Sequence, residues 1–457
     1  MKAAPKPGRR GDVPRRTAYD VLAAVEEREA YANLLLPRLL TDRNVTGRDA
    51  ALATELTYGT LRGIGTYDAV LAACSDRPVA KLDPPVRHVL RLGTHQLLAT
   101  RVGSHAAVAT SVDLVRAVVG PKVSGYVNAV LRRVSTRDAE QWMDIVAPRP
   151  DADPDGYLAV RHSYPRWIVG AYRDALGAAA AGELGDALAA GNARPRVTMA
   201  VFPGGAAREE VMPDGAEPGR WSPYAFTLAG GDPSALTASG RAAVQDEASQ
   251  LAAIALTRAA AEPGSGAWLD LCAGPGGKAR MLRGLAGARL VAADLHPHRA
   301  GLIRAALDAA PGSEPAAVVA ADGRRPPWRD GAFDRVLADV PCSGLGALRR
   351  RPEARWRKSA GDLADLGELQ RSLLRSALAA ARPGGVVAYV TCSPVPAETS
   401  GIVTAVTAED DAAEILDAPA MLPEVPGLAA PDSRFAQFWP HRHGTDAIFV
   451  ALLRRRA

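Results

Sequence analysis

The chain has 457 residues, of which 47% are hydrophobic and 23% are charged, a composition typical of a soluble protein with more than one domain. No uninterrupted apolar run approaches the roughly 18 residues that a membrane-spanning helix needs, so we expect no membrane span. The net charge of +5 equals that of residues 1–16 alone, so overall charge does not indicate a nucleic-acid partner.

The first 146 residues are predicted to form a tail followed by a helical domain. Residues 1–13 are basic and proline-rich with no apolar stretch behind them, which predicts a disordered tail and argues against a secretory signal. Apolar residues then recur at helical spacing, for example over 85–100, 106–119 and 125–134. We therefore predict one all-helical domain over residues 14–146.

Two further regions follow. Residues 147–241 begin with the linker APRPDADPDG and then give short helical stretches, one alternating strand at 196–202 and Gly/Pro-rich loops, which predicts a small α+β subdomain. Residues 242–457 instead alternate apolar strands with helices. The predicted strands are 267–271, 289–293, 316–320, 335–338 and 386–391. This pattern predicts an α/β domain with a mostly parallel sheet, closed by an antiparallel edge hairpin from FAQFWP and AIFVALLRR.

A ligand site is predicted where these strands end. The segment LDLCAGPGGKA, residues 269–279, joins a strand to a helix through a Gly-rich turn, which suits either a nucleotide-type ligand or a plain turn. Asp294, Asp322 and Asp339 follow successive strands. Each alone is a solvated strand end, but together they suit a ligand with a ribose, an adenine amine and a cationic centre.

Cysteines supply the second chemical feature. The chain has four, with no CxxC pair and no Cys/His cluster of zinc-ligand spacing, so we expect no metal and a reducing, cytoplasmic location. Cys342 in DVPCSG and Cys392 in VTCSP both follow strands of the same predicted sheet. They are either buried core residues or thiols at the mouth of the ligand site, where a thiolate can attack an electron-poor ring.

Together these segments resemble the bacterial ribosomal RNA cytosine-5 methyltransferases of the Sun/Fmu (RsmB) type. The helical region is similar to the RNA-binding NusB fold, through RRTAYDVL, LTYGTLR, VLRLGTHQLL and GYVNAVLRRV. The remaining matching segments, in family order, are AVQDEASQ, DLCAGPGGK, ADGR, DVPCSG, RRPEARW and VTCSP.

The resemblance implies a Rossmann-like domain that transfers a methyl group from S-adenosylmethionine to carbon 5 of a cytosine in 16S ribosomal RNA. Cys392 is then the nucleophile that attacks carbon 6, Cys342 aids product release, and Asp339 contacts the cytosine or the cofactor. The implied cofactor-binding residues are Cys272, Ala273, Gly274, Pro275, Gly276, Gly277, Lys278, Asp294, Asp322 and Asp339. The implied partner is small-subunit ribosomal RNA, free or in an assembly intermediate, and we expect a monomer.

Other functions stay open. The same chemistry can act on a transfer RNA or another ribosomal site, and a NusB-like domain fused to a degenerate methyltransferase can be a non-catalytic RNA-binding assembly factor. DNA cytosine-5 methyltransferases use the Pro-Cys cysteine, which makes Cys342 the rival nucleophile. A metabolic oxidoreductase is disfavoured by the absence of GxGxxG.

Three details of the sequence carry further expectations. Arg349, Arg350, Arg351, Arg355, Arg357 and Lys358 flank Trp356, which suits either an RNA backbone track with a stacking residue or a solvated face with a core Trp. Gly274 stands where relatives carry Ala, a change that we expect to be harmless. Glu398 matches the family's Pro-Glu-Glu-Asn segment, while Thr399 or Ser400 replaces its Asn.

Overall fold

The computed structural model describes residues 12–261, 264, 266–309, 316–409 and 413–456. They fall into two compact units, each described here by itself. The first runs to Gly170 and includes Arg350–Arg357, and the second comprises Ala171–Arg349 and the chain from Lys358. The predicted tail spans residues 1–13, and residues 1–11 of it lie outside the described residues. The predicted domain boundaries at 146 and 241 stay predictions.

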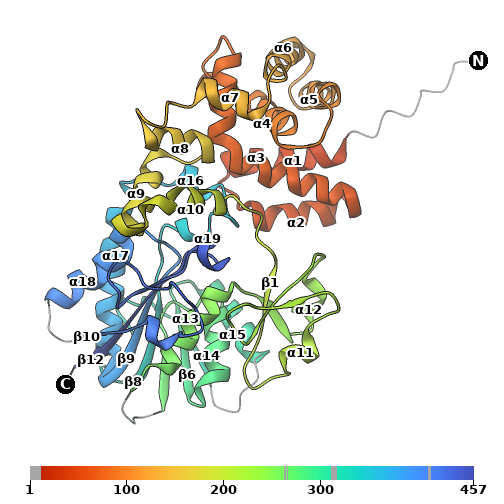
Figure 1. The fold of residues 1–457 in the computed structure, drawn as a ribbon. Helices are drawn as coiled ribbons and strands as arrows, with labels where there is room; N and C mark the ends of the chain where they lie inside the picture. Colours follow the sequence, from red (N-terminus) through yellow and green to blue (C-terminus); the bar gives the residue numbers. More distant parts are fainter. Residues whose placement is uncertain (1–11, 262–263, 265, 310–315, 410–412, 457) are drawn as a thin grey trace, which may run out of the picture. The chain divides into compact units, whose positions relative to one another are not determined.

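The first unit is helical throughout its described residues (Figure 1). Asp12 begins it by accepting a hydrogen bond from the backbone of Arg15 at the start of α1, which satisfies a free N–H of the first turn. The helices are α1 (Val13–Glu27), α2 (Ala32–Asp42), α3 (Gly47–Cys74), α4 (Pro84–Ala99), α5 (Ser104–Val118), α6 (Ser124–Val134), α7 (Ala139–Val146), α8 (Pro154–His162) and the short α16 (Ala354–Arg357). The helix α9 (Arg166–Leu176) spans the junction of the two units.

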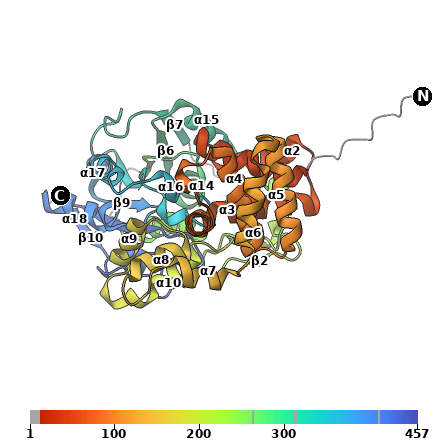
Figure 2. The ribbon, with the colours of Figure 1, turned by 90° about the horizontal axis from the view of Figure 1, so that it is seen from above.

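The long helix α3 organises this unit, because it packs against α1, α4 and α6 along one apolar core. Leu56, Leu61 and Leu71 of α3 are buried there together with Val89 of α4 and Leu131 of α6. Helices α4, α5 and α6 pack side by side (Figure 2). The predicted helical segments at 85–100, 106–119 and 125–134 correspond to these three helices, displaced by one or two residues.

The second unit contains two sheets. A four-stranded antiparallel sheet has the order β2-β3-β1-β4, and the predicted strand at 196–202 is its β1. Its strands are β1 (Thr198–Val201), β2 (Glu217–Pro218), β3 (Ala225–Thr227) and β4 (Ala242–Val244), with helices α10 (Leu184–Ala190), α11 (Arg208–Val211) and α12 (Ser234–Ala238) in the same region of the chain.

An eight-stranded sheet forms the core of this unit, with the order β10-β12-β9-β8-β5-β6-β7 and β11 paired to β12. Strands β9, β8, β5, β6 and β7 are parallel, while β10, β11 and β12 are antiparallel to their partners. The strands are β5 (Ala267–Asp270), β6 (Arg289–Asp294), β7 (Ala316–Ala320), β8 (Phe333–Asp339), β9 (Ala381–Thr391), β10 (Ala413–Leu416), β11 (Ala436–Gln437) and β12 (Phe449–Arg455). The predicted fold class, a mostly parallel sheet with an antiparallel edge, is therefore confirmed.

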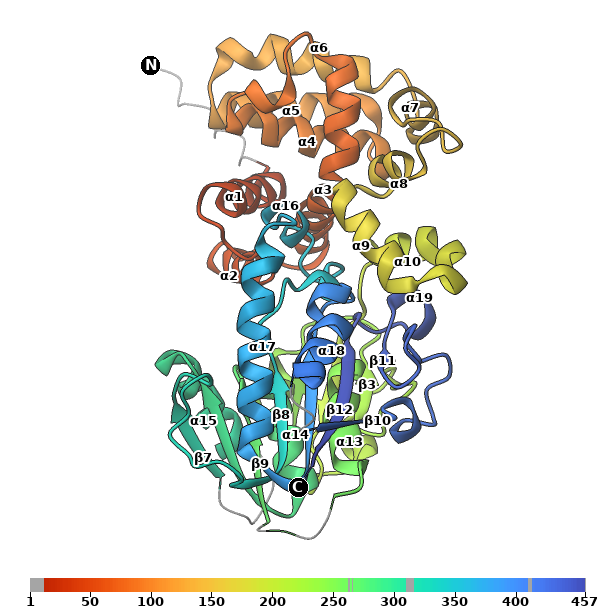
Figure 3. The same cartoon turned by 90° about the vertical axis from the view of Figure 1, so that its left-hand side faces the viewer.

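Helices cover both faces of the large sheet, which explains why its central strands read as continuous apolar runs. One face packs on α13 (Glu247–Arg258), α14 (Gly277–Ala286) and α15 (Pro297–Asp308). The other packs on α17 (Asp362–Ala380) and α18 (Ser400–Glu409), which run along the strands in Figure 3. A last short helix, α19 (Pro440–His443), lies between β11 and β12 in sequence. No helix in the described part of the chain combines the length and apolarity that crossing a membrane requires.

Candidate active site

Predicted site residues gather where the parallel strands end, together with Asp270, which the sequence analysis did not single out. Asp270, Asp294 and Asp339 are the last residues of β5, β6 and β8. Cys392 directly follows β9, and Cys342 lies three residues beyond β8. Because these four strands are parallel neighbours, all five residues lie at one edge of the sheet, the edge at which open α/β sheets bind ligands.

The Gly-rich turn Cys272–Lys278 runs from β5 into α14, and its backbone conformation favours glycine at position 276. Gly276 has a φ of +112° and immediately precedes α14, and a Cβ there would lie 2.8 Å from the Cβ of Ala306. A Cβ on Gly274 would lie 2.3 Å from Oδ2 of Asp294. An Ala at this position would require the Asp294 carboxylate to shift, and the expectation that Gly274 is harmless stays a prediction.

Two acidic residues continue the edge beyond β5. Asp294 is 5% exposed, and its Oδ1 accepts a hydrogen bond of 2.9 Å from the backbone of His296. Asp322 lies two residues after β7 and forms an ion pair of 2.7 Å with Arg324. Hydrogen bonds from Arg324 lower the pKa of Asp322 to about 2, so this carboxylate is charged at neutral pH.

An ion pair joins the first turn of α14 to the end of β8. Lys278 Nζ lies 2.7 Å from Oδ2 of Asp339, and the Lys278 side chain is 12% exposed. Burial is the largest single effect and lowers the pKa of Lys278, but the charge and hydrogen bond of Asp339, together with Cys392 and Asp270, outweigh it, and the pKa is raised. Lys278 therefore stays charged and holds the Asp339 carboxylate beside the glycine-rich turn.

The two cysteines face each other. Sγ of Cys342 lies 3.2 Å from Sγ of Cys392. The hydrogen bond from Cys342 lowers the pKa of Cys392 against the opposing effect of burial. The same bond, with burial, raises the pKa of Cys342 well above its ordinary value. These opposite shifts favour the thiolate on Cys392 over the thiolate on Cys342.

Comparison with known proteins decides the family. Residues 257–454 match the family model described as 16S rRNA methyltransferase RsmB/F, and residues 12–136 match the NusB family. A relative from Pseudomonas putida, "Ribosomal RNA small subunit methyltransferase B", is 33% identical over 453 residues, which cover 96% of this chain and 98% of the relative. This chain belongs to the RsmB/F family of 16S rRNA methyltransferases.

Two further comparisons agree with this membership. "Putative methyltransferase Rv1407" of Mycobacterium tuberculosis is 48% identical over 450 residues, which cover 97% of each chain. The crystal structure of PH0851 has the same fold, with a TM-score of 0.79 at 23% identity over 99% of this chain and all of that one. The predicted family is thus confirmed, and this RsmB/F protein is an S-adenosylmethionine-dependent RNA methyltransferase.

The residues around the turn fit the cofactor of an RsmB/F methyltransferase. Both carboxylate oxygens of Asp270 are buried, and neither accepts a well-formed hydrogen bond from the described residues. Burial, aided by the charge of Asp339, raises the pKa of Asp270 to about 8. The side-chain amide of Gln245 is also buried and unsatisfied among the described residues, and it lies beside Gly277. Such groups at a helix start call for a polar ligand.

Three arginines of the basic run, Arg349, Arg355 and Arg357, bind partners inside this RsmB/F protein, so at these positions neither interpretation made from the sequence holds. Arg349, 8% exposed, is bound by Asp246 and Asp446. Arg355 is fully buried, donates to the carbonyl of Ser163 and lies 4.0 Å over the ring of Tyr164.

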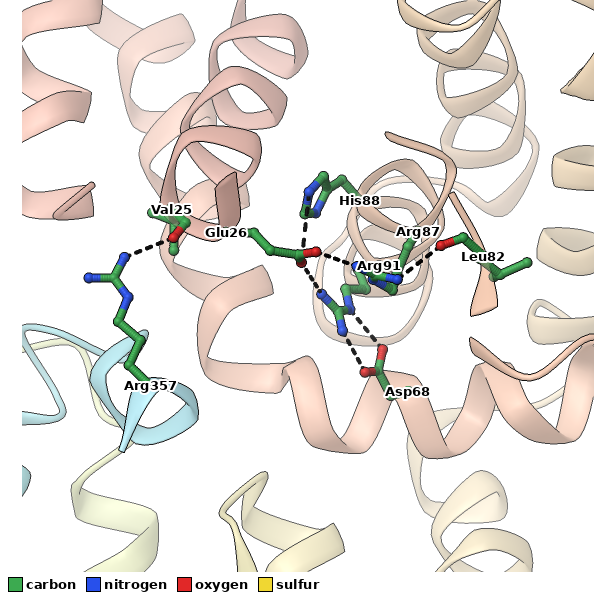
Figure 4. Close-up of polar contacts among 8 residues, drawn as sticks. All are labelled: Val25, Glu26, Asp68, Leu82, Arg87, His88, Arg91 and Arg357. Atoms are coloured by element: carbon green, nitrogen blue, oxygen red, sulfur yellow. Dashed lines mark hydrogen bonds and ion pairs between the residues drawn. The ribbon is translucent and has the colours of Figure 1, made fainter. Parts of the chain in front are cut away.

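Arg357 is also used internally, at the end of α1. It donates to the carbonyls of Val25 and Ala30, next to the network in which Glu26 bridges Arg87 and Arg91 (Figure 4). Trp356 is 38% exposed and lies against Gly65, where a Cβ would come within 2.7 Å of its ring. These three arginines therefore stabilise the fold, and no local pattern indicated their distant partners.

Proposed function

We propose that the protein methylates carbon 5 of a cytosine in 16S ribosomal RNA through a covalent adduct between Cys392 and carbon 6 of the ring. The observation that carries this proposal is the pair of sulfurs 3.2 Å apart, at the strand edge that also holds the Lys278–Asp339 ion pair. Cytosine carbon 5 is a weak nucleophile, so a thiolate must first add to the ring, and Cys392 has the lowered pKa that this step requires.

The residues at the glycine-rich turn would hold the cofactor. The Cys272–Lys278 backbone at the start of α14 and the Asp294 carboxylate suit a nucleoside with a ribose, and Asp322 suits its adenine amine. When bound, S-adenosylmethionine supplies the methyl group on a positively charged sulfur. The Asp339 carboxylate favours such a cation at this edge, and the cation would in turn favour loss of the proton from Asp270, whose pKa is about 8 without it.

Cys392 and Asp339 would act first. The Cys392 thiolate forms a bond to carbon 6, and the electrons of the carbon 5–carbon 6 double bond make carbon 5 nucleophilic toward the methyl group. Asp339, held by Lys278, can accept a hydrogen bond from the cytosine amine and so orient the ring.

Cys342 would act second. Once the Cys392 sulfur is bonded to carbon it carries no charge, so the main cause of the raised pKa of Cys342 is gone. Cys342 can then lose its proton to solvent and take the carbon 5 proton, directly or through a water. The carbon 6–sulfur bond breaks, its electrons return to Cys392, and the ring double bond re-forms. Both thiols must stay reduced for this sequence, from which we infer a cytoplasmic location.

The proposal is tested with three cysteine variants and ribosomal RNA. Cys392→Ala should abolish methyl transfer, and Cys342→Ala should accumulate a protein–RNA adduct that survives denaturation. Cys74→Ala is the matched control, because Cys74 is buried in α3, in the core of the helical unit, and the sheet belongs to the other unit. Turnover in Cys392→Ala would refute the assignment of Cys392 as the nucleophile. Normal turnover without an adduct in Cys342→Ala would refute the role of Cys342 in product release.

The RNA substrate needs its own experiment. The NusB family match and the small-subunit name of the relative support 16S ribosomal RNA. Bisulfite sequencing of ribosomal and transfer RNA from a deletion strain should show loss of methylation at one small-subunit cytosine. Loss at a transfer RNA would contradict the substrate. No loss at any cytosine would contradict the activity and favour a non-catalytic assembly factor.

A further inference from the structure

A serine follows each of the two cysteines, and both serines bind the same carboxylate. Ser343 donates to Glu398 from its backbone N–H to Oε1 over 2.7 Å and from its hydroxyl to Oε2 over 2.5 Å. Ser393 donates its hydroxyl to the same Oε2 over 2.6 Å. The Glu398 carboxylate therefore joins the loop after β8 to the loop after β9.

Glu398 is buried among neutral hydrogen-bond donors. It is 0% exposed, and no ion pair of its carboxylate occurs within the described part of the chain. Its remaining donor is the amide of Gln370, at 3.2 Å, which also donates to the carbonyl of Pro341 next to Cys342. A buried carboxylate is costly unless hydrogen bonds satisfy it, and here four donors occupy it fully. Glu398 thus has no site left for substrate and can act only through its neighbours.

We propose that Glu398 is a positioning residue that holds the thiols of Cys342 and Cys392 at bonding distance by tying Ser343 to Ser393. The inference rests on the proposed function, since the distance matters only if the two thiols work as a pair. A second contact has the same effect, because the backbone N–H of Gly346 donates to the carbonyl of Cys392 over 2.8 Å.

The charge of Glu398 adds to its positioning effect. The negative carboxylate disfavours a thiolate on Cys342 and contributes to its raised pKa, after the larger effects of the Cys392 hydrogen bond and burial. The single negative charge of the pair is thereby directed to Cys392. Loosening the tie should move the sulfurs apart and raise the pKa of Cys392, because its stabilising donor is lost.

The primary test is Glu398→Gln in the full chain. The amide has nearly the same volume but carries no charge, and its NH2 group is held by the Ser343 and Ser393 hydroxyls only if both turn to accept, which replaces two charge-assisted hydrogen bonds by weaker neutral ones. We expect kcat to fall about a hundredfold, as for a misplaced reacting group, with KM for RNA and S-adenosylmethionine nearly unchanged. The pH midpoint for alkylation of Cys392, followed by peptide mass spectrometry, should rise by about one unit.

Asp334→Asn is the matched control. Asp334 is also a buried carboxylate of the large sheet, bonded to the backbone of Gly266 and to Arg382, but it lies at the opposite end of β8 from Cys342. Asp334→Asn should lower the free energy of unfolding without shifting the pH midpoint for alkylation of Cys392. If Glu398→Gln does not fold, the double variant Ser343→Ala/Ser393→Ala removes the tie while the carboxylate remains, and it should show the same kcat loss and midpoint shift.

Two results would overturn the inference. One is an unchanged Cys392 midpoint with unchanged kcat in Glu398→Gln. The other is an equal effect on both quantities in Asp334→Asn, which would make the role of Glu398 purely structural. Neither result resembles failure of the proposed function, which would appear as turnover in Cys392→Ala.

Discussion

Arg349 offers the sharpest test of whether the basic run serves the fold or the RNA. Its guanidinium lies 2.7 Å from Asp246, contacts Asp446, and donates to the carbonyl of Gly444 over 2.6 Å. The side chains of Arg349, Asp246 and Asp446 are each less than a tenth exposed. Arg349→Met keeps the length of the side chain but leaves both carboxylates buried without this cation.

The expected cost follows from that burial. Removing one partner of a buried ion pair costs about 3–5 kcal/mol, and a cation shared by two carboxylates belongs at the upper end. A loss of about 5 kcal/mol is a third or more of the stability of an ordinary domain. Arg349→Met/Asp446→Asn should recover part of this loss, because it removes one of the two uncompensated charges.

Urea unfolding measures the loss, and RNA binding at several salt concentrations separates the two roles. The control Lys358→Met removes one charge from the same run at a half-buried position and should change stability by less than about 0.5 kcal/mol. If Arg349 instead contacts a phosphate of the RNA, Arg349→Met should have near-normal stability, and its RNA binding should depend less on the salt concentration. That outcome would refute the structural role assigned to Arg349.

Three further predictions concern titration and packing. Burial lowers the pKa of His88 to about 4, so below about pH 6.5 the unfolded chain binds a proton that the folded chain does not. The free energy of unfolding should therefore fall by about 2 kcal/mol between pH 7 and pH 5. His88→Gln should flatten this loss in urea unfolding at the two pH values. The pKa of Asp270 is raised to about 8, so here the folded chain binds the extra proton, and stability without cofactor should fall by about 2 kcal/mol from pH 6 to pH 8. Asp270→Asn should remove that fall, and an unchanged slope would contradict the buried protonated acid. Gly274→Ala should displace Asp294 and weaken S-adenosylmethionine binding about tenfold in calorimetry, whereas equal affinity would show that the Ala is accommodated.

The sheet and its ligand edge were predictable because each strand carries its own local signal. A strand buried on both faces is an apolar run in the sequence, and the acidic residue at its end marks the edge, as with Asp294 in β6 and Asp339 in β8. The start of β9 was missed, since Ala381 lies five residues before the predicted strand in a Pro-Gly-Gly stretch. Ala381 is in the strand because it pairs with Phe333 across a register shift, which is a tertiary effect.

Side-chain partners were not predictable, because they are set by packing between distant segments. A run of arginines reads the same whether its members face solvent or, like Arg349, meet carboxylates 97 and 103 positions away. The same limit applies at the thiols. The motifs identify Cys342 and Cys392, but they do not say that Glu398 binds the serine after each one. Motifs therefore locate the reacting groups. The residues that position those groups through charge and hydrogen bonds had no role assigned from the sequence alone.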